Sequence, residues 1–220
     1  MSDTAAYQGR DPQFHFPKVF YLPHHNLAFG GVGSCYVLLK MYEYLCGQTL
    51  FRGFDDAAQV VKPLLMQANA EFKKSLGAEA DNFNFHDVNA PKEPASVNTI
   101  YNVLVLVGYS LTLKRMAALV FDDQPTTETQ LSEGLICVPA VPPDLLNVFQ
   151  HYAQTDPQHA LIATAEAQHA GMKNELGHFG SGGKLVCHHV MEHEATCKTI
   201  HHFDNNAEFS QRLKEKQHEH

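Results

Sequence analysis

The sequence contains little positive charge and no cluster of it. It has 16 lysines and arginines against 24 aspartates and glutamates, which gives a net charge of −8 at pH 7. Proteins that bind the phosphates of a nucleic acid usually present a basic patch. A nucleic-acid partner is therefore not expected.

Long apolar runs and a secretory signal are missing as well. No hydrophobic stretch reaches the roughly 20 residues that cross a bilayer. Residues 1–13 are polar and lack the basic and apolar segments of a signal peptide. We expect no membrane span, and a cytoplasmic location or secretion by a route without a cleavable signal peptide.

Cysteines are few and scattered, and phosphate-binding loops are missing. An odd number of widely spaced cysteines does not match the disulfide framework of a small secreted protein, so reduced thiols are expected. The Gly-rich loops of the common nucleotide-binding folds are also missing. Neither a cofactor nor a resident metal is expected. The cysteines are Cys35, Cys46, Cys137, Cys187 and Cys197.

What the sequence does contain is enough apolar material for a core. Hydrophobic residues make up 44% and charged residues 18% of the 220 positions. This length fits a single domain. We expect that domain to span residues 1–214, with an extended N-terminal arm at 1–29, a flexible loop at 171–183 and a polar tail at 215–220.

The first half of the chain predicts helices. Apolar residues recur at helical spacing between Tyr36 and Cys46, Ser34 can cap the first turn, and Gly47 can close the last. This predicts an amphipathic helix that begins at or beside Cys35. Further helices are predicted at 55–76 with a break near Pro63, at 96–108 and at 143–154.

The second half predicts mainly strands. Short β-branched segments separated by turn residues are typical of strands. Helices first and strands later indicate an α+β fold with a mostly antiparallel sheet packed on the first helices. The predicted strands are 111–116, 135–141, 160–167, 184–194 and 198–204.

Cys35 is the candidate nucleophile. A helix N-terminus stabilises a thiolate through unpaired backbone N–H groups and the positive end of the dipole. The Gly-rich approach at 30–33 would let a substrate backbone come close, and the Cys35 amide could donate to an oxyanion. The alternative is that Cys35 is a small buried side chain after a turn.

A catalytic thiol needs a base and a group that orients the base. If Glu194–Cys197 forms the turn of a hairpin, Asp204 returns close to His189. The carboxylate could then accept the imidazole N–H. His159 and His178 are alternative bases.

The order of these residues resembles the papain-like cysteine fold, most closely the compact bacterial effector branch of proteases and glutamine deamidases. The resemblance implies that Cys35 is the nucleophile, His189 the general base and acid, and Asp204 the orienting carboxylate. That family usually has a Gln or Asn shortly before the Cys for the oxyanion hole. The nearest amide here is Asn26, which joins Gly33 and Ser34 as the expected oxyanion and substrate-binding group.

A metal site is the rival interpretation of the same segment. On a helix, residues four apart form one stripe that could hold zinc. The segment also matches the HxxEH pattern of inverted zinc peptidases, with Glu192 as base. Strand-forming residues between the histidines count against this arrangement, and several of the histidines can simply occupy solvent positions of a sheet. The stripe comprises His189, His193, Cys197 and His201. The histidines expected at solvent-facing and groove-facing sheet positions are His188, His193, His201 and His202.

The expected function is hydrolysis of an amide bond by a peptidase or glutamine deamidase, through an acyl-enzyme on Cys35. The substrate would be a protein, a peptide or a small acyl or amide compound. An acyltransferase or transglutaminase with the same triad is one alternative. A zinc-binding or zinc-hydrolase domain at 188–202 is another. The sequence does not fix the oligomeric state.

Overall fold

The structure is a computed structural model. It describes residues 2–3, 5–8, 11–48, 51–76, 102–122, 130–132, 155–176, 182–204, 211 and 214. The predicted strand 135–141, the predicted helix 143–154, His178, Cys137 and the tail 215–220 lie outside the described residues.

A five-stranded antiparallel sheet forms the centre of the fold. Its strands follow the order β4-β5-β6-β7-β8, so that each strand pairs with its neighbour in sequence. A short 3-10 turn, Pro23–His25, joins the first two strands. The strands are β4 (Val19–Leu22), β5 (Leu27–Val32), β6 (Val103–Ser110), β7 (Arg115–Asp122) and β8 (Gln130–Ser132).

Two helices, α1 (Cys35–Gly47) and α2 (Phe54–Leu76), cover one face of this sheet. Alternate strand residues point to that face, where Phe29, Leu104 and Leu106 pack with the apolar stripes of both helices in one buried cluster. This cluster is the main core, and it packs α1, which begins beside the end of β5 and the start of β6, against the sheet.

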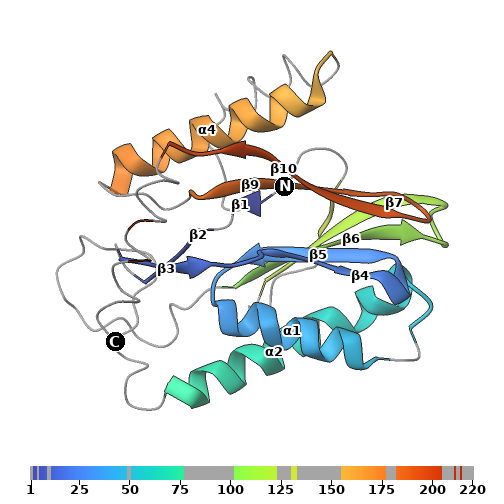
Figure 1. The fold of residues 1–220 in the computed structure, drawn as a ribbon. Coiled ribbons are helices and arrows are strands. Elements are labelled where there is room, and N and C mark those ends of the chain that lie inside the picture. The colour runs from blue at the N-terminus through green and yellow to red at the C-terminus, as the bar shows by residue number, and fades with distance from the viewer. Residues whose placement is uncertain are drawn as a thin grey trace.

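A second sheet lies on the other side of the first. It contains β1 (Ser2–Asp3), β9 (Lys184–Val190) and β10 (Ala195–His202) in the order β1-β9-β10. Helix α4 (Pro157–Leu176) packs on it through Ala165, Leu185 and Phe203. Figure 1 shows the resulting order of layers: α1 and α2, the β4–β8 sheet, the β1-β9-β10 sheet, and α4. A separate pair, β2 (Ala5–Gln8) with β3 (Asp11–His15), completes the described strands.

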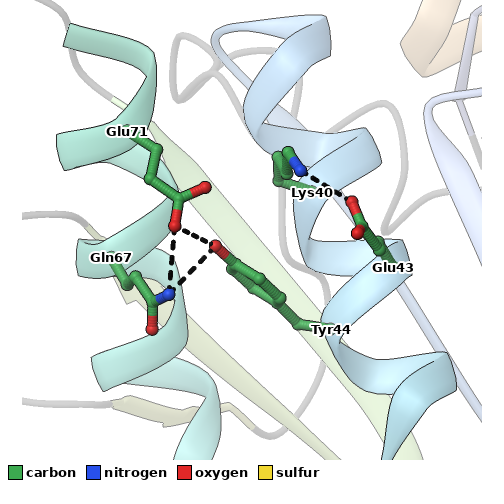
Figure 2. Close-up of polar contacts among 5 residues, drawn as sticks. All are labelled: Lys40, Glu43, Tyr44, Gln67 and Glu71. Atoms are coloured by element: carbon green, nitrogen blue, oxygen red, sulfur yellow. Dashed lines mark hydrogen bonds and ion pairs between the residues drawn. The ribbon is translucent and has the colours of Figure 1, made fainter. Parts of the chain in front are cut away.

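A polar contact on the solvent side ties α1 to α2 (Figure 2). The Tyr44 hydroxyl donates to Glu71 Oε1 at 2.6 Å, and Gln67 Nε2 donates to the same carboxylate oxygen at 3.0 Å. These bonds from Tyr44 and Gln67 hold the pKa of the Glu71 carboxyl below its ordinary value. On α1 itself, Lys40 pairs with Glu43 at 2.8 Å.

The coarse prediction is confirmed, because helices and antiparallel sheets make up one mixed fold. Helix α1 also begins at Cys35, as predicted. In the described part of the chain, none of the helices combines the length and the apolar character that crossing a membrane requires.

Several predicted elements were wrong. Residues 103–108 form a strand, because the β-branched residues Val103, Val105 and Val107 favour it. Residues 111–114 are a turn rather than part of a strand, and residues 19–22 and 27–29 of the predicted arm lie within the main sheet. Helix α2 continues through Pro63, which is exposed to solvent.

The most consequential error concerns residues 157–176, which were predicted as a strand followed by a flexible loop and form α4 instead. The start of this helix is well marked. Asp156 Oδ1 accepts the His159 N–H at 2.9 Å, and Pro157 occupies the first helical position. Alanine at 160, 163, 165 and 167 then favours the helix over a strand.

Candidate functional site

Cys35 follows a turn that only small residues can form. A side chain on Gly31 would place its Cβ 2.0 Å from the Val103 carbonyl oxygen. Gly33 has a φ of 120°, and its Cβ would lie 2.2 Å from Asn102 Oδ1. The Gly-rich approach therefore brings β5 and the start of α1 against β6, which is a packing role.

A chain of buried amides supports this turn. The Ser34 N–H donates to Asn102 Oδ1 at 2.8 Å, and Asn102 Nδ2 donates to Asn69 Oδ1 on α2 at 3.0 Å. All three residues are buried. The sequence predicted that the Ser34 side chain caps α1, and this prediction was wrong, because the side chain makes no capping hydrogen bond. Asn102 instead fixes the Ser34 backbone. Sequence reasoning missed Asn69 and Asn102, although Asn102 is the lone amide directly before the apolar run 103–107 and so required a partner.

The surroundings of Cys35 favour the neutral thiol. Burial raises the pKa of Cys35, and this effect outweighs the opposing effects of the Lys18 charge and of the residue's own backbone N–H. The side chain packs against the main core. The helix N-terminus is present as predicted, but desolvation dominates, so thiolate at neutral pH is suppressed.

The β9–β10 register separates His189 from Asp204. The turn lies at 191–194, where the Met191 N–H donates to the Glu194 carbonyl at 2.8 Å, and not at Glu194–Cys197. His189 pairs with Thr196 near that turn, whereas the residue before Asp204, Phe203, bonds to Gly183 at the other end of the hairpin. Six strand residues, about 20 Å, separate the two positions. The predicted contact is therefore wrong.

His189 is also separated from Cys35. It lies on the face of the hairpin that carries Lys198, whose Nζ donates to Gln158 of α4 at 2.9 Å, and it is exposed. Cys35 lies in the α1 and α2 layer, beyond the β4–β8 sheet. Both sheets stand between the two residues, and the structure does not bring the predicted triad together.

Asn26 lies far from Cys35, and so it cannot supply the expected oxyanion donor. It precedes β5 whereas Cys35 follows it, so the six strand residues between them span about 20 Å. Asn26 instead adopts a left-handed conformation, and its Nδ2 donates to the carbonyl of Met191 at 3.0 Å and to that of Glu192. It joins the β4–β5 corner to the β9–β10 turn. Gly33 and Ser34 serve the turn described above.

The structure also places His159, the alternative base, and the predicted zinc-binding stripe differently from the sequence prediction. His159 lies exposed in the first turn of α4 and does not head a strand. Residues 188–202 are strands with a turn, so His189, His193, Cys197 and His201 do not form one stripe; His201 instead contacts Glu166 of α4 at 3.1 Å. Among the residues that the structure describes, no group of three or more His, Cys, Asp or Glu side chains could hold a metal.

The hairpin does bring one thiol and one imidazole together. Cys197 pairs with His188 across β9 and β10, and Cys197 Sγ lies 4.0 Å from His188 Nε2. Both residues lie on the face of the hairpin opposite to the one that carries Lys198 and contacts α4. Of the four cysteines that the structure describes, Cys197 is exposed and the others are partly buried.

This pair has the electrostatics of a thiol with an adjacent base. Burial lowers the pKa of His188 from its ordinary value of 6.5, so the ring is neutral at pH 7 and can accept a proton. Cys187 precedes His188 and therefore points to the opposite face. A hairpin turn at 191–194 would have predicted the pair from sequence, but that segment, MEHE, contains none of the usual turn residues.

Comparison with known protein families and with curated protein sequences found no match to this chain.

Proposed function

We propose that the protein is a thiol-dependent hydrolase of amide or thioester bonds, in which Cys197 is the nucleophile and His188 the general base. The observation that carries the proposal is the 4.0 Å separation of Cys197 Sγ from His188 Nε2, with the imidazole in its neutral form. Such contacts are often long in a free enzyme and shorten when substrate binds.

The chemistry follows from this pair. His188 Nε2 accepts the thiol proton as Cys197 Sγ bonds to the substrate carbonyl carbon. The bond to the leaving amine or thiol then breaks, and the leaving group departs with that proton. A water molecule next attacks the acyl-enzyme while His188 accepts its proton, which releases the acid and restores the thiol.

The exposure of Cys197 favours a large substrate and water as the acceptor of the acyl group. An exposed nucleophile can meet a carbonyl presented by a protein or peptide, and water reaches the acyl-enzyme freely. Hydrolysis therefore needs no second pocket, whereas transfer to an amine would. A cytoplasmic location suits this function because the cytosol keeps thiols reduced.

Only part of the papain-like resemblance supports the proposal. Its support is the helix that begins at Cys35 and packs on an antiparallel sheet. The reacting pair departs from that pattern, since it lies on a hairpin in the other sheet. We therefore propose thiol chemistry of the same class with a different nucleophile.

Acylation by a small thioester tests the proposal. The full-length protein is incubated with phenyl thioacetate, and the acetylated cysteines are identified by peptide mass spectrometry. We expect acetylation chiefly at Cys197, turnover of the thioester, and loss of both in Cys197→Ser. Hydrolysis of a peptide amide is then measured with the same variants.

Cys35→Ser and Cys187→Ser are the matched controls. Cys187 lies one strand away on the opposite face of the hairpin, so its replacement perturbs the same sheet without removing the pair. Both controls should turn over the thioester at the wild-type rate. Turnover that survives Cys197→Ser and disappears in Cys35→Ser would overturn the proposal.

A further inference from the structure

The turn between β6 and β7 exposes large apolar side chains. In this segment, residues 110–116, called the β6–β7 tip, Leu111 is 66%, Leu113 42% and Met116 36% exposed. Lys114 and Arg115, beside them, are exposed too. Clustered exposed apolar residues on a soluble protein mark interaction sites.

The β6–β7 tip is held in a defined conformation. Asp55, in the first turn of α2, accepts hydrogen bonds from Ser110 Oγ at 2.6 Å, from the Thr112 N–H at 3.0 Å and from Thr112 Oγ1 at 3.1 Å. Ser110 Oγ in turn accepts the Leu113 N–H at 3.0 Å. The leucines are thus presented outward by a fixed backbone, which lowers the entropy lost on binding.

A second tip, of opposite charge, lies at the same end of the molecule. This β9–β10 tip, residues 191–194, exposes Glu192 and Glu194. Its backbone is bonded to Asn26, and the next residue, Leu27, pairs with Gly108 at the end of β6. Both turns accordingly lie at the right-hand end of the view in Figure 1.

We propose that this end of the molecule is the contact between two copies of the chain. In a two-fold symmetric interface, each contact between a first and a second surface occurs twice, once in each direction. The basic, apolar tip of each copy would therefore face the acidic tip of the other copy. Lys114 and Arg115 of the β6–β7 tip carry positive charge, and Glu192 and Glu194 of the β9–β10 tip carry negative charge. The leucines would supply the buried centre of the contact.

The acidic β9–β10 tip, and not the net charge, favours a second copy over an anionic membrane. Two chains of −8 repel each other at long range, and an anionic lipid surface would repel the chain as well. A second copy brings Glu192 and Glu194 on a folded turn, which can lie opposite the β6–β7 tip. The inference is independent of the chemistry proposed for Cys197, since it uses neither residue of the pair.

Sedimentation velocity of the full-length protein over a range of concentrations tests the contact. We expect a monomer–dimer equilibrium in the wild type. The double variant Leu111→Ser/Leu113→Ser should raise the dimer dissociation constant more than about tenfold, because it removes the apolar centre. The matched control is Leu39→Ser, at an exposed leucine on α1, which should dimerise as the wild type does.

Charge reversal distinguishes this geometry from non-specific association. Lys114→Glu alone and Glu192→Lys/Glu194→Lys alone should each be monomeric, and mixing the two variants should restore a dimer, because unlike tips then face each other. A monomer at all concentrations in the wild type would overturn the proposal. So would a dimer that the tip variants leave unchanged, or binding of the tip to phosphatidylserine vesicles without dimerisation.

Discussion

Cys35 and Cys197 occupy opposite kinds of site. Cys35 begins a helix after a glycine-rich turn and packs against the main core, and burial raises the pKa of its thiol. Cys197 lies on an exposed strand, 4.0 Å from an imidazole. Cys35 has the helix dipole, and among the described residues no base adjoins its thiol, whereas Cys197 has an adjacent base without a helix dipole.

The comparison shows that a helix N-terminus is not enough to activate a thiol. Its effect on a charge is typically worth 0.3–1 kcal/mol, roughly, and it is easily outweighed when the sulfur leaves water. An adjacent base works differently, because it accepts the proton only when the thiol reacts. The structural role of the Cys35 turn and the chemical role proposed for Cys197 can therefore be separated by mutation.

The largest effect is expected from His188→Ala. Removing the general base should slow acylation of Cys197 by about 10²–10⁴-fold while leaving the fold intact. The rate of thioester turnover measures this directly.

His189→Ala provides the matched control, since His189 is the next residue on the same strand and points to the opposite face. It should react at the wild-type rate. Equal loss in both variants would mean that hairpin stability, and not proton transfer, controls the rate.

A smaller effect, on stability, is expected from Asn102→Leu. The change leaves the Ser34 N–H and the Asn69 side chain without their bonds to Asn102, at a cost of roughly 2–4 kcal/mol for two buried polar groups. Urea unfolding should show the loss. The exposed change Gln59→Leu on α2 should stay within about 0.5 kcal/mol of the wild type.

Asn102→Leu also tests whether the Cys35 and Cys197 regions are independent. For this test, acylation of Cys197 is measured under conditions in which the variant is folded. Acylation of Cys197 should be unchanged, because the amide network supports only the Cys35 end. A large drop in acylation would show that the two regions are coupled.

The sequence could predict α1 because its apolar spacing is unambiguous and the core face is built from that stripe. It could not distinguish strand from helix at 103–108, since a short apolar run has no clear period. At α4 two signals conflict: Asp156 and Pro157 mark the start of a helix, whereas the β-branched and apolar residues of ALIATA favour a strand.

The site was harder to predict because it depends on register. Placing the hairpin turn three residues too late paired His189 with Asp204 in place of His188 with Cys197. A change of one residue moves a side chain to the other face of a sheet. The hairpin itself was predictable from sequence, whereas its chemistry depends on the register that the structure shows.

Residue-resolved alkylation by iodoacetamide, between about pH 5 and 8, tests the central claim most directly. The native full-length protein is sampled over time, and each cysteine is quantified by peptide mass spectrometry. We predict that Cys197 reacts first and that His188→Ala slows it. Cys35 should lag across this range because of its raised pKa. Fast, preferential modification of Cys35 at mildly acidic pH, with Cys197 unaffected by His188→Ala, would contradict the account.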